Sequence, residues 1–259
     1  MSKISIITRS DDLGSSVSAN EGIKSVCDAG FFKNVSVMAP GPYIEHAAKL
    51  LAHRTDICFG MHITINAEWD KVKWKPVSNV GQDCGLIDEN GYFLNSPQLF
   101  RETKPSVDVI MNEIDAQYNR LIKLGFDIKY IDSHMMSEFC VPGMDDAVKD
   151  FANEKGLIDH MYFYHDPLGF YEACNKPDTL PDYIKSLPDD QYLIVMHPAL
   201  YGEDMLLTGT ADIPGKQIAE ERSAEAKLFS NPELIKTLSS CGFKSIRYDE
   251  AKLQKRMII

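Results

Sequence analysis

Residues 107–134, VDVIMNEIDAQYNRLIKLGFDIKYIDSH, decide the fold class. Their first part has apolar residues at the 3.6-residue spacing of one helix face, namely Val107, Ile110, Met111, Ile114, Tyr118, Leu121 and Ile122. We therefore predict a helix over 107–123, which ends at Gly125. Residues 128–133 have the composition of a buried strand, so the stretch is one helix–strand unit.

The same alternation continues on both sides of this stretch. Further strands are expected at 4–8, 35–38, 57–65, 192–196 and 244–248, and further helices at 17–31, 42–53, 143–155, 215–229 and 232–240. Because parallel strands need crossover connections, these units predict an α/β fold with a parallel sheet covered by helices. About seven such units in 259 residues favour a distorted (β/α) barrel, complete or incomplete, over an open sheet. No G-x-G-x-x-G motif follows the first strand, which weakens the dinucleotide-binding alternative.

We expect one domain over residues 1–259. The chain is 44% hydrophobic, which is enough for a single substantial core. A long irregular stretch at about 66–105 carries both tryptophans and the turn DENG at 88–91, and a second loop spans about 166–191. Connections of this length inside a compact domain usually cover or line a site, so we treat 66–105 as a loop insertion with a small hairpin.

Charge and cysteine content limit the classes of partner. A net charge of -11 argues against nucleic acid and anionic membranes, because no basic face is available to neutralise phosphates. The six cysteines form no C-x-x-C pair, no signal peptide precedes the first strand, and no apolar run has the length of a membrane span. We expect a cytoplasmic protein with reduced thiols that acts on a small substrate, and the sequence leaves open whether it forms a homodimer.

Ionisable residues gather where the predicted strands end. In parallel α/β folds the active groups lie at the carboxyl ends of the strands. Four predicted strands bring such groups to that edge: Asp11 and Asp12, His62, Asp132 and His134, and His197. The other histidines lie on a helix or in loops, and we expect surface or packing roles for His46, His53, His160 and His165.

Each of these residues also has an ordinary structural explanation. An Asp-Asp pair after a strand is typical of a turn or a helix cap, and a histidine in an apolar strand is often a core residue bonded to backbone. The combination is more specific, because one carboxylate and two imidazoles are a common ligand set for a catalytic metal ion. A second carboxylate beside the first is suited to act as a general base.

Five segments, in chain order from about residue 3 to 250, resemble the YdjC-like (chitooligosaccharide deacetylase) family. TRSDDLGSSVSANEGI at 8–23 resembles the family's N-A-D-D-F-G signature followed by N-x-G-I. FGMHITI at 59–65 resembles G-L-H-L-T-L, YIDSHMM at 130–136 resembles H-x-D-S-H-x-H, and MHPAL at 196–200 resembles H-P-G. Residues 221–250 resemble the family's Arg-x-x-Glu helix and final strand.

The resemblance implies a partly open (β/α) barrel related to the polysaccharide deacetylases. It also implies a hydrolase that removes acetyl groups from N-acetylated sugars with a divalent metal ion, of which zinc and magnesium are the first expectations. Position by position, the family's metal ligands match Asp12, His62 and His134. The general base matches Asp11, and the histidine that acts as an acid matches His197.

Further positions allow two interpretations each. Asp132 either hydrogen-bonds a liganding histidine or ties down a loop at the strand end. Arg222 and Glu225 match the late helix motif, where they either contact substrate or form a structural i,i+3 ion pair. The sequence departs from the family at Met136, at Ala199 and at Leu13, where the family usually has histidine, glycine and phenylalanine.

Two alternatives to deacetylation stay open. One is a metal-dependent hydrolase of a phosphoester or another amide, and the other is a sugar-binding protein without activity. The two long loops are expected to narrow the site, which favours a mono- or short oligosaccharide over a polymer. Six aromatic residues in these loops either stack on sugar rings or anchor the loops: Trp69, Trp74, Tyr92, Tyr162, Tyr164 and Tyr171.

Overall fold

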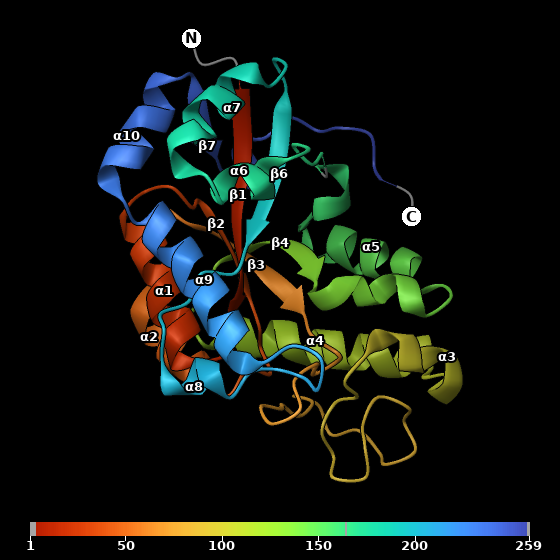
Figure 1. The fold of residues 1–259 in the computed structure, drawn as a ribbon. Helices are drawn as coiled ribbons and strands as arrows, with labels where there is room; N and C mark the ends of the chain where they lie inside the picture. Colours follow the sequence, from red (N-terminus) through yellow and green to blue (C-terminus); the bar gives the residue numbers. More distant parts are fainter. Residues whose placement is uncertain (1–3, 164, 258–259) are drawn as a thin grey trace.

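The computed structural model describes residues 4–163 and 165–257. Its strands are β1 (Ile4–Leu13), β2 (Asn34–Val37), β3 (Cys58–Ile63), β4 (Ile128–Ser133), β5 (Ile158–Asp159), β6 (Gln191–Met196) and β7 (Phe243–Ile246). They form one sheet of order β5-β4-β3-β2-β1-β6, with β7 also paired to β1, and every pairing of these strands is parallel. The strand direction turns steadily from β6 and β1 to β3 and β4, so the sheet curls into a half-barrel (Figure 1). This confirms the predicted incomplete (β/α) barrel.

The helices follow the strands in sequence and cover the outside of the sheet (Figure 1). The longer ones are α1 (Val17–Asp28), α2 (Ile44–Leu51), α4 (Val107–Lys123), α5 (Met144–Lys155), α7 (Leu180–Ser186), α9 (Gly215–Phe229) and α10 (Pro232–Ser240). The shorter ones are η1 (Pro97–Leu99), α3 (Phe100–Thr103), η2 (His134–Cys140), η3 (His160–Tyr162), α6 (Phe170–Cys174), η4 (Pro177–Thr179), α8 (Glu203–Leu206) and η5 (Tyr248–Glu250). In the part of the chain that the structure describes, no helix combines the length and apolarity needed to cross a membrane.

Strand β1 pairs with three other strands of the sheet. Its first half lies between β7 and β6, and its second half lies between β2 and β6. Asn34, the first residue of β2, links β2 to β1 and β7 at the point where β2 replaces β7 as the neighbour of β1. Its Nδ2 donates to the carbonyls of Thr8 and Ile246 at 3.0 Å each, and its Oδ1 accepts from the backbone N–H of Tyr248 at 2.8 Å. A buried asparagine thus satisfies backbone groups that the strand exchange would leave unpaired.

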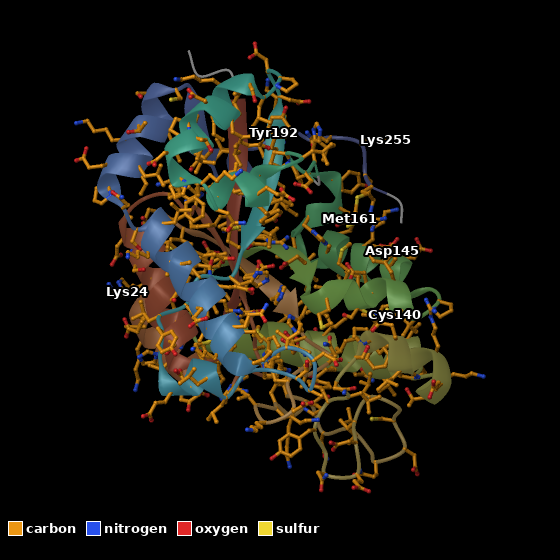
Figure 2. All side chains as sticks on the ribbon, in the orientation of Figure 1. Lys24, Cys140, Asp145, Met161, Tyr192 and Lys255 are labelled. Carbon is orange, nitrogen blue, oxygen red and sulfur yellow. The ribbon has the colours of Figure 1, made fainter. Side chains whose placement is uncertain are left out.

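The gap between the edge strands β5 and β6 is covered by the C-terminal segment. The backbone N–H groups of Gln254 and Met257 donate to the carbonyls of Tyr162 and Met161, both at 2.9 Å. Gln191, at the start of β6, bonds the segment from the other side. Met161 is labelled in Figure 2, where side chains fill the space between the sheet and its helices. The irregular C-terminal segment therefore closes the barrel between β5 and β6, and these two strands do not pair with each other.

The first strand is longer than the sequence pattern predicts. It runs to Leu13, so Asp11 and Asp12 lie inside the strand and not after it. The register of β1 against β2 is irregular between Ser10 and Leu13, and Asp12 has a left-handed φ of 68°. In a regular strand, successive side chains point to opposite faces. The bulge removes this alternation, and both aspartates line the same cavity.

The two long loops contain more helical structure than expected. In the stretch 66–105 an isolated antiparallel bridge between Ile87 and Phe93 spans the turn 88–91, as a small hairpin would, and the helices η1 and α3 are additional. The stretch 166–191, expected to be a loop, contains α6, η4 and α7. Strand β5 has only 2 residues, too few to give a periodic pattern.

Candidate active site

A cavity of about 370 Å³ opens at the carboxyl ends of the strands. Cavities of about 790 and 660 Å³ lie elsewhere, but this smaller one collects the ionisable groups. It is lined by Arg9, Asp11, Asp12, His62, Glu68, Trp69, Ser133, His134, Met135, Met136, His160, Tyr171, Val195, His197 and Arg222. Most of these residues follow or end β1, β3, β4, β5 and β6, as the rule for parallel sheets predicts.

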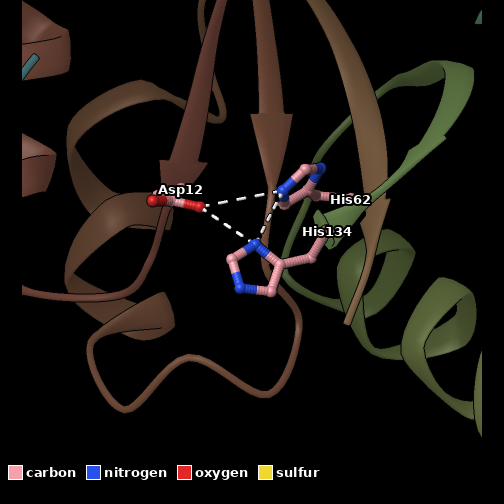
Figure 3. Close-up of side chains that lie close together, drawn as sticks. All are labelled: Asp12, His62 and His134. Atoms are coloured by element: carbon pink, nitrogen blue, oxygen red, sulfur yellow. Dashed lines mark hydrogen bonds and ion pairs between the residues drawn. The ribbon is translucent and has the colours of Figure 1, made fainter. Parts of the chain in front are cut away.

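Three buried side chains in this cavity face a common point (Figure 3). Oδ1 of Asp12 is 3.5 Å from Nδ1 of His134 and 3.7 Å from Nε2 of His62, and the two nitrogens are 3.3 Å apart. Among the described residues, nothing donates a hydrogen bond to this buried Asp12 oxygen. A buried carboxylate oxygen without a donor, facing two imidazole nitrogens, fits a divalent metal ion that all three would bind.

The outer nitrogen of each histidine contacts a carboxylate. Nδ1 of His62 is 2.9 Å from Oδ2 of Asp132, and Nε2 of His134 is 2.7 Å from Oε2 of Glu68. An ionised carboxylate only accepts hydrogen bonds, so each outer nitrogen carries the proton and each inner nitrogen keeps its lone pair when the ring is neutral. Histidines that bind metal ions are commonly held by carboxylates in this way.

The charge around the two imidazoles also suits a dication. The carboxylates of Asp12, Asp132 and Glu68 contact the two imidazoles. Arg222 binds Asp12, and Arg9 lies between Asp132 and Asp11. Four negative charges and two positive charges leave two negative charges when both imidazoles are neutral. A divalent cation would balance them.

The pKa values of His134, His62 and Asp12 reflect the same charges. Burial by itself would lower the pKa of His134, but the charges of Glu68 and Asp12 raise it to about 10. Burial opposes the charges of Asp132 and Asp11 at His62 too, and the pKa of His62 is raised. For Asp12, burial is outweighed by Arg222 and the nearby histidines, and the pKa of the carboxyl is well below its usual range. The negative charges that raise the pKa of His134 would also favour a metal cation, which has to displace the proton from the ring nitrogen that binds it.

A second group of possible ligands, Asp11, His62 and Asp132, lies beside the first. Its two carboxylates already share Arg9. Nε and Nη2 of Arg9 bind the two oxygens of Asp11 at 2.8 and 2.9 Å, and Nη2 is 3.3 Å from Oδ2 of Asp132. Asp12 with the two histidines is therefore the better-suited set, and Asp11 lies next to it with its orientation fixed by Arg9.

His197 follows β6 and lines the cavity together with these residues. Its backbone N–H donates to Oε2 of Glu225 at 2.7 Å. Burial raises the pKa of Glu225, although His197 and Arg222 act against the shift. Arg222, one turn earlier on α9, binds Oδ2 of Asp12 through Nη1 at 2.9 Å. Arg222 and Glu225 thus contact different parts of the site, the carboxylate of Asp12 and the backbone of His197.

Three ionisable residues of this cavity, Arg9, Glu68 and His160, are absent from the set expected from the sequence. Arg9 precedes Asp11 by two positions in a strand, and this spacing on one face was a usable signal. His160 is buried, lines the cavity and lies with Nδ1 3.4 Å from Nη1 of Arg9, so its expected surface or packing role misses this contact with the site. Glu68 lies in the 66–105 stretch, which has no periodicity to indicate where its side chains point.

The aromatic residues divide into two groups. Trp69 and Tyr171 line the cavity, and the ring of Trp69 lies 5.8 Å from the guanidinium carbon of Arg222. Trp74 is buried, and its Nε1 donates to the carbonyl of Asn66 at 2.8 Å, so it anchors the loop. Tyr92 and Tyr162 do not line the cavity, and Tyr164 is outside the described residues.

Two consecutive methionines follow His134 in an unusual backbone conformation. Met135 and Met136 have φ values of 55° and 50°, which are uncommon for residues other than glycine. Both line the cavity, so strained backbone lies at the site itself. Asn66 Nδ2 donates to the sulfur of Met135 at 3.0 Å, which connects this turn to the 66–105 stretch.

Comparison with known proteins places the chain in a group of relatives. A family model described as YdjC-like protein matches residues 5–240. A carbohydrate deacetylase of Thermoanaerobacter pseudethanolicus is 26% identical over 78% of this chain and 83% of its own. The carbohydrate deacetylase of Geobacillus stearothermophilus is 25% identical over 94% and 96%.

One solved structure shares the fold over almost the whole length. It is described as a putative cellobiose-phosphate cleavage protein from Enterococcus faecalis V583. It superposes with a TM-score of 0.72 at 18% identity, and the match covers 95% of this chain and 98% of the other. At this identity the likeness supports the fold alone.

Proposed function

The chain belongs to the YdjC-like family, and from that premise we propose that it is a metal-dependent hydrolase that removes acetyl groups from N-acetylated mono- or short oligosaccharides. The observation that carries the proposal is the arrangement of Asp12, His62 and His134 around one point, with Asp11 beside them. Relatives of similar length that are named carbohydrate deacetylases support the same activity.

We assign the metal ion to Asp12, His62 and His134. Two imidazoles and one carboxylate are ligands that zinc commonly takes in hydrolases, so zinc is favoured over magnesium, which prefers oxygen ligands. The chemistry that such an ion supplies is polarisation of the acetamide carbonyl and activation of a water molecule. Asp132 and Glu68 orient the two imidazoles.

The remaining residues have distinct roles in the proposed reaction. Asp11 accepts the proton of the attacking water, and Arg9 holds both of its oxygens in place. His197, in its protonated form, donates a proton to the amine that leaves. Arg222 binds the Asp12 oxygen that does not face the histidines, which leaves Oδ1 for the ion.

The cavity supports a small substrate. Its volume of about 370 Å³ is at the lower end of the range for ligand pockets, about 300–1,000 Å³. Trp69 and Tyr171 at its edge offer apolar ring faces of the kind that pack on sugars. Both arginines of the site are bound to carboxylates, which weighs against a phosphoester as the reacting group.

The test is acetate release from N-acetylated mono-, di- and trisaccharides, with zinc or magnesium added to metal-stripped protein. We expect release that depends on the added ion and falls as the sugar chain lengthens. The Asp11→Asn variant is the matched control for contaminating activity. No release from any N-acetyl sugar by metal-loaded protein would overturn the proposal in favour of another hydrolase or a sugar-binding protein. Preference for long chitin would overturn the small-substrate part.

We also propose a cytoplasmic location. All six cysteines are free in the structure, as is common in reducing compartments. Cell fractionation with an antibody against the protein tests the location. The homodimer stays a prediction, which light scattering of the purified protein would decide.

A further inference from the structure

Glu68 contacts the site from the long connection between β3 and α4. Its Oε2 lies 2.7 Å from Nε2 of His134, and its side chain is only 12% exposed. The contact is on the side of the imidazole away from Asp12 and His62, because Nδ1 of His134 is the atom that faces them. Glu68 can thus orient the imidazole of His134, and it does not lie on the side of the ring that faces the proposed metal ion.

The backbone around Glu68 is fixed from several directions. The N–H of Ala67 donates to the carbonyl of Leu94 at 2.8 Å, and the N–H of Asp70 donates to that of Gly209 at 2.9 Å. Trp69 packs against apolar residues of α1, α8 and α9. A carboxylate held between two such anchors loses little conformational freedom when it binds the histidine.

Glu68 also completes a pattern. His62 has the buried carboxylate of Asp132 on its outer nitrogen, at 2.9 Å, and His134 has Glu68 in the same relation at 2.7 Å. Asp132 comes from a neighbouring strand, whereas Glu68 comes from an irregular segment that no strand pairing positions. The two histidines are therefore oriented by equivalent groups of different structural origin.

We propose that Glu68 is a positioning residue, which orients His134 through its Nε2–H and keeps Nδ1 as the atom that binds the metal ion. The inference rests on the proposed metal site. It adds that the 66–105 stretch is part of that site, because it contributes the carboxylate of Glu68. Loss of Glu68 leaves the three ligands in place but lets the imidazole of His134 rotate.

The test compares Glu68→Ala and Glu68→Gln with the wild-type protein by metal affinity. Zn²⁺ binding is measured by competition with a chromophoric chelator, and the Co²⁺-substituted protein is measured by its visible absorption spectrum. We expect Glu68→Ala to bind Zn²⁺ about 10–100-fold more weakly, the range typical of carboxylates behind a liganding histidine, with an altered Co²⁺ spectrum. Glu68→Gln keeps an oxygen acceptor at the same place, and we expect it to recover part of the affinity.

The matched control is Glu89→Gln, an exposed carboxylate of the same stretch that does not line the cavity. It should bind Zn²⁺ as the wild type does. Unchanged affinity and spectrum in Glu68→Ala would overturn the inference. An equal loss of Zn²⁺ affinity in Glu68→Ala and Glu68→Gln would also overturn it, because the effect would then come from the charge of Glu68. A loss as complete as in His134→Ala would overturn it as well, because Glu68 would then be a ligand. Failure of the wild type to bind Zn²⁺ would instead overturn the proposed metal site together with this inference.

Discussion

At the scale of single residues, Asp12 has the most constrained position in the site. Its backbone is left-handed, one carboxylate oxygen binds Arg222, and the other faces two imidazoles without a hydrogen-bond donor among the described residues. A non-glycine residue in this conformation is costly and persists where the surroundings require it. A bound metal ion gives the physical reason for keeping an aspartate there.

Asp12→Ala, His62→Ala and His134→Ala are each expected to lose most of the bound metal while the protein stays folded. Each removes one of only three proposed protein ligands. Elemental analysis of the purified variants, with circular dichroism to verify folding, measures the effect. Full metal occupancy in any one variant would remove that residue from the ligand set.

Asp11→Asn is expected to retain the metal ion and to lose activity by about 10²–10⁴-fold, the contribution typical of a general base. Asparagine keeps the shape of the side chain, and its amide oxygen still accepts from Arg9, but it cannot take up the proton of water. Acetate release and metal content are measured on the same sample. If the metal were lost and activity per bound metal kept, Asp11 and Asp12 would have to exchange roles.

Metal binding is expected to tighten as the pH rises. The pKa of His134 is raised from 6.5 to about 10, so at neutral pH the metal-free protein holds a proton on the nitrogen that would bind the ion. A cation must displace this proton, and fewer protons have to be displaced at higher pH. Calorimetric titration with Zn²⁺ in buffers of different ionisation enthalpy measures the release. Binding without proton release at any pH from neutral up to the raised pKa would contradict the assignment of His134.

At the scale of elements, β1 and α9 bring the charged groups together. The bulge in β1 turns both aspartates into one cavity, and α9 supplies Arg222 to Asp12 and Glu225 to the backbone of His197. The end of α9 is held by Phe229, which stacks on Phe31 with 4.4 Å between the ring centres. Packing at one end of the helix thus supports polar contacts at its middle.

Phe229→Ala is expected to lower the free energy of unfolding by about 3–5 kcal/mol, the usual cost of removing a buried phenylalanine ring. Phe229 is fully buried and also contacts Phe32 and Phe170. Denaturant unfolding followed by fluorescence measures the change. Glu220→Ala, at an exposed position of the same helix, is the control and should change stability little. A loss below about 1 kcal/mol would show that α9 is held by other contacts.

At the scale of the whole molecule, an open half-barrel is completed by irregular chain. The C-terminal segment bridges β6 and the residues after β5, and Arg256 binds the carboxylates of Asp145 and Asp159. On the site side, the 66–105 stretch adds Glu68 and Trp69 to the cavity. The strands bring the ligands to one edge, and the irregular segments close the space around them.

The repeating strand–helix order and the residue types at the strand ends can be predicted from the sequence. Apolar periodicity is a local property, and the rule that parallel strands end at one edge needs only their order. These two arguments are sufficient to place Asp12, His62, His134 and His197 at the same edge of the sheet.

Contacts that depend on side-chain direction and on irregular chain are a property of the tertiary structure. The bulge that brings Asp11 and Asp12 to one side is invisible in a pattern that assumes alternation. Glu68 and His160 come from segments without periodicity, and Arg222 binds Asp12 from about 210 residues away. Such contacts are set by how distant elements pack, and neither spacing nor composition along the chain contains that information.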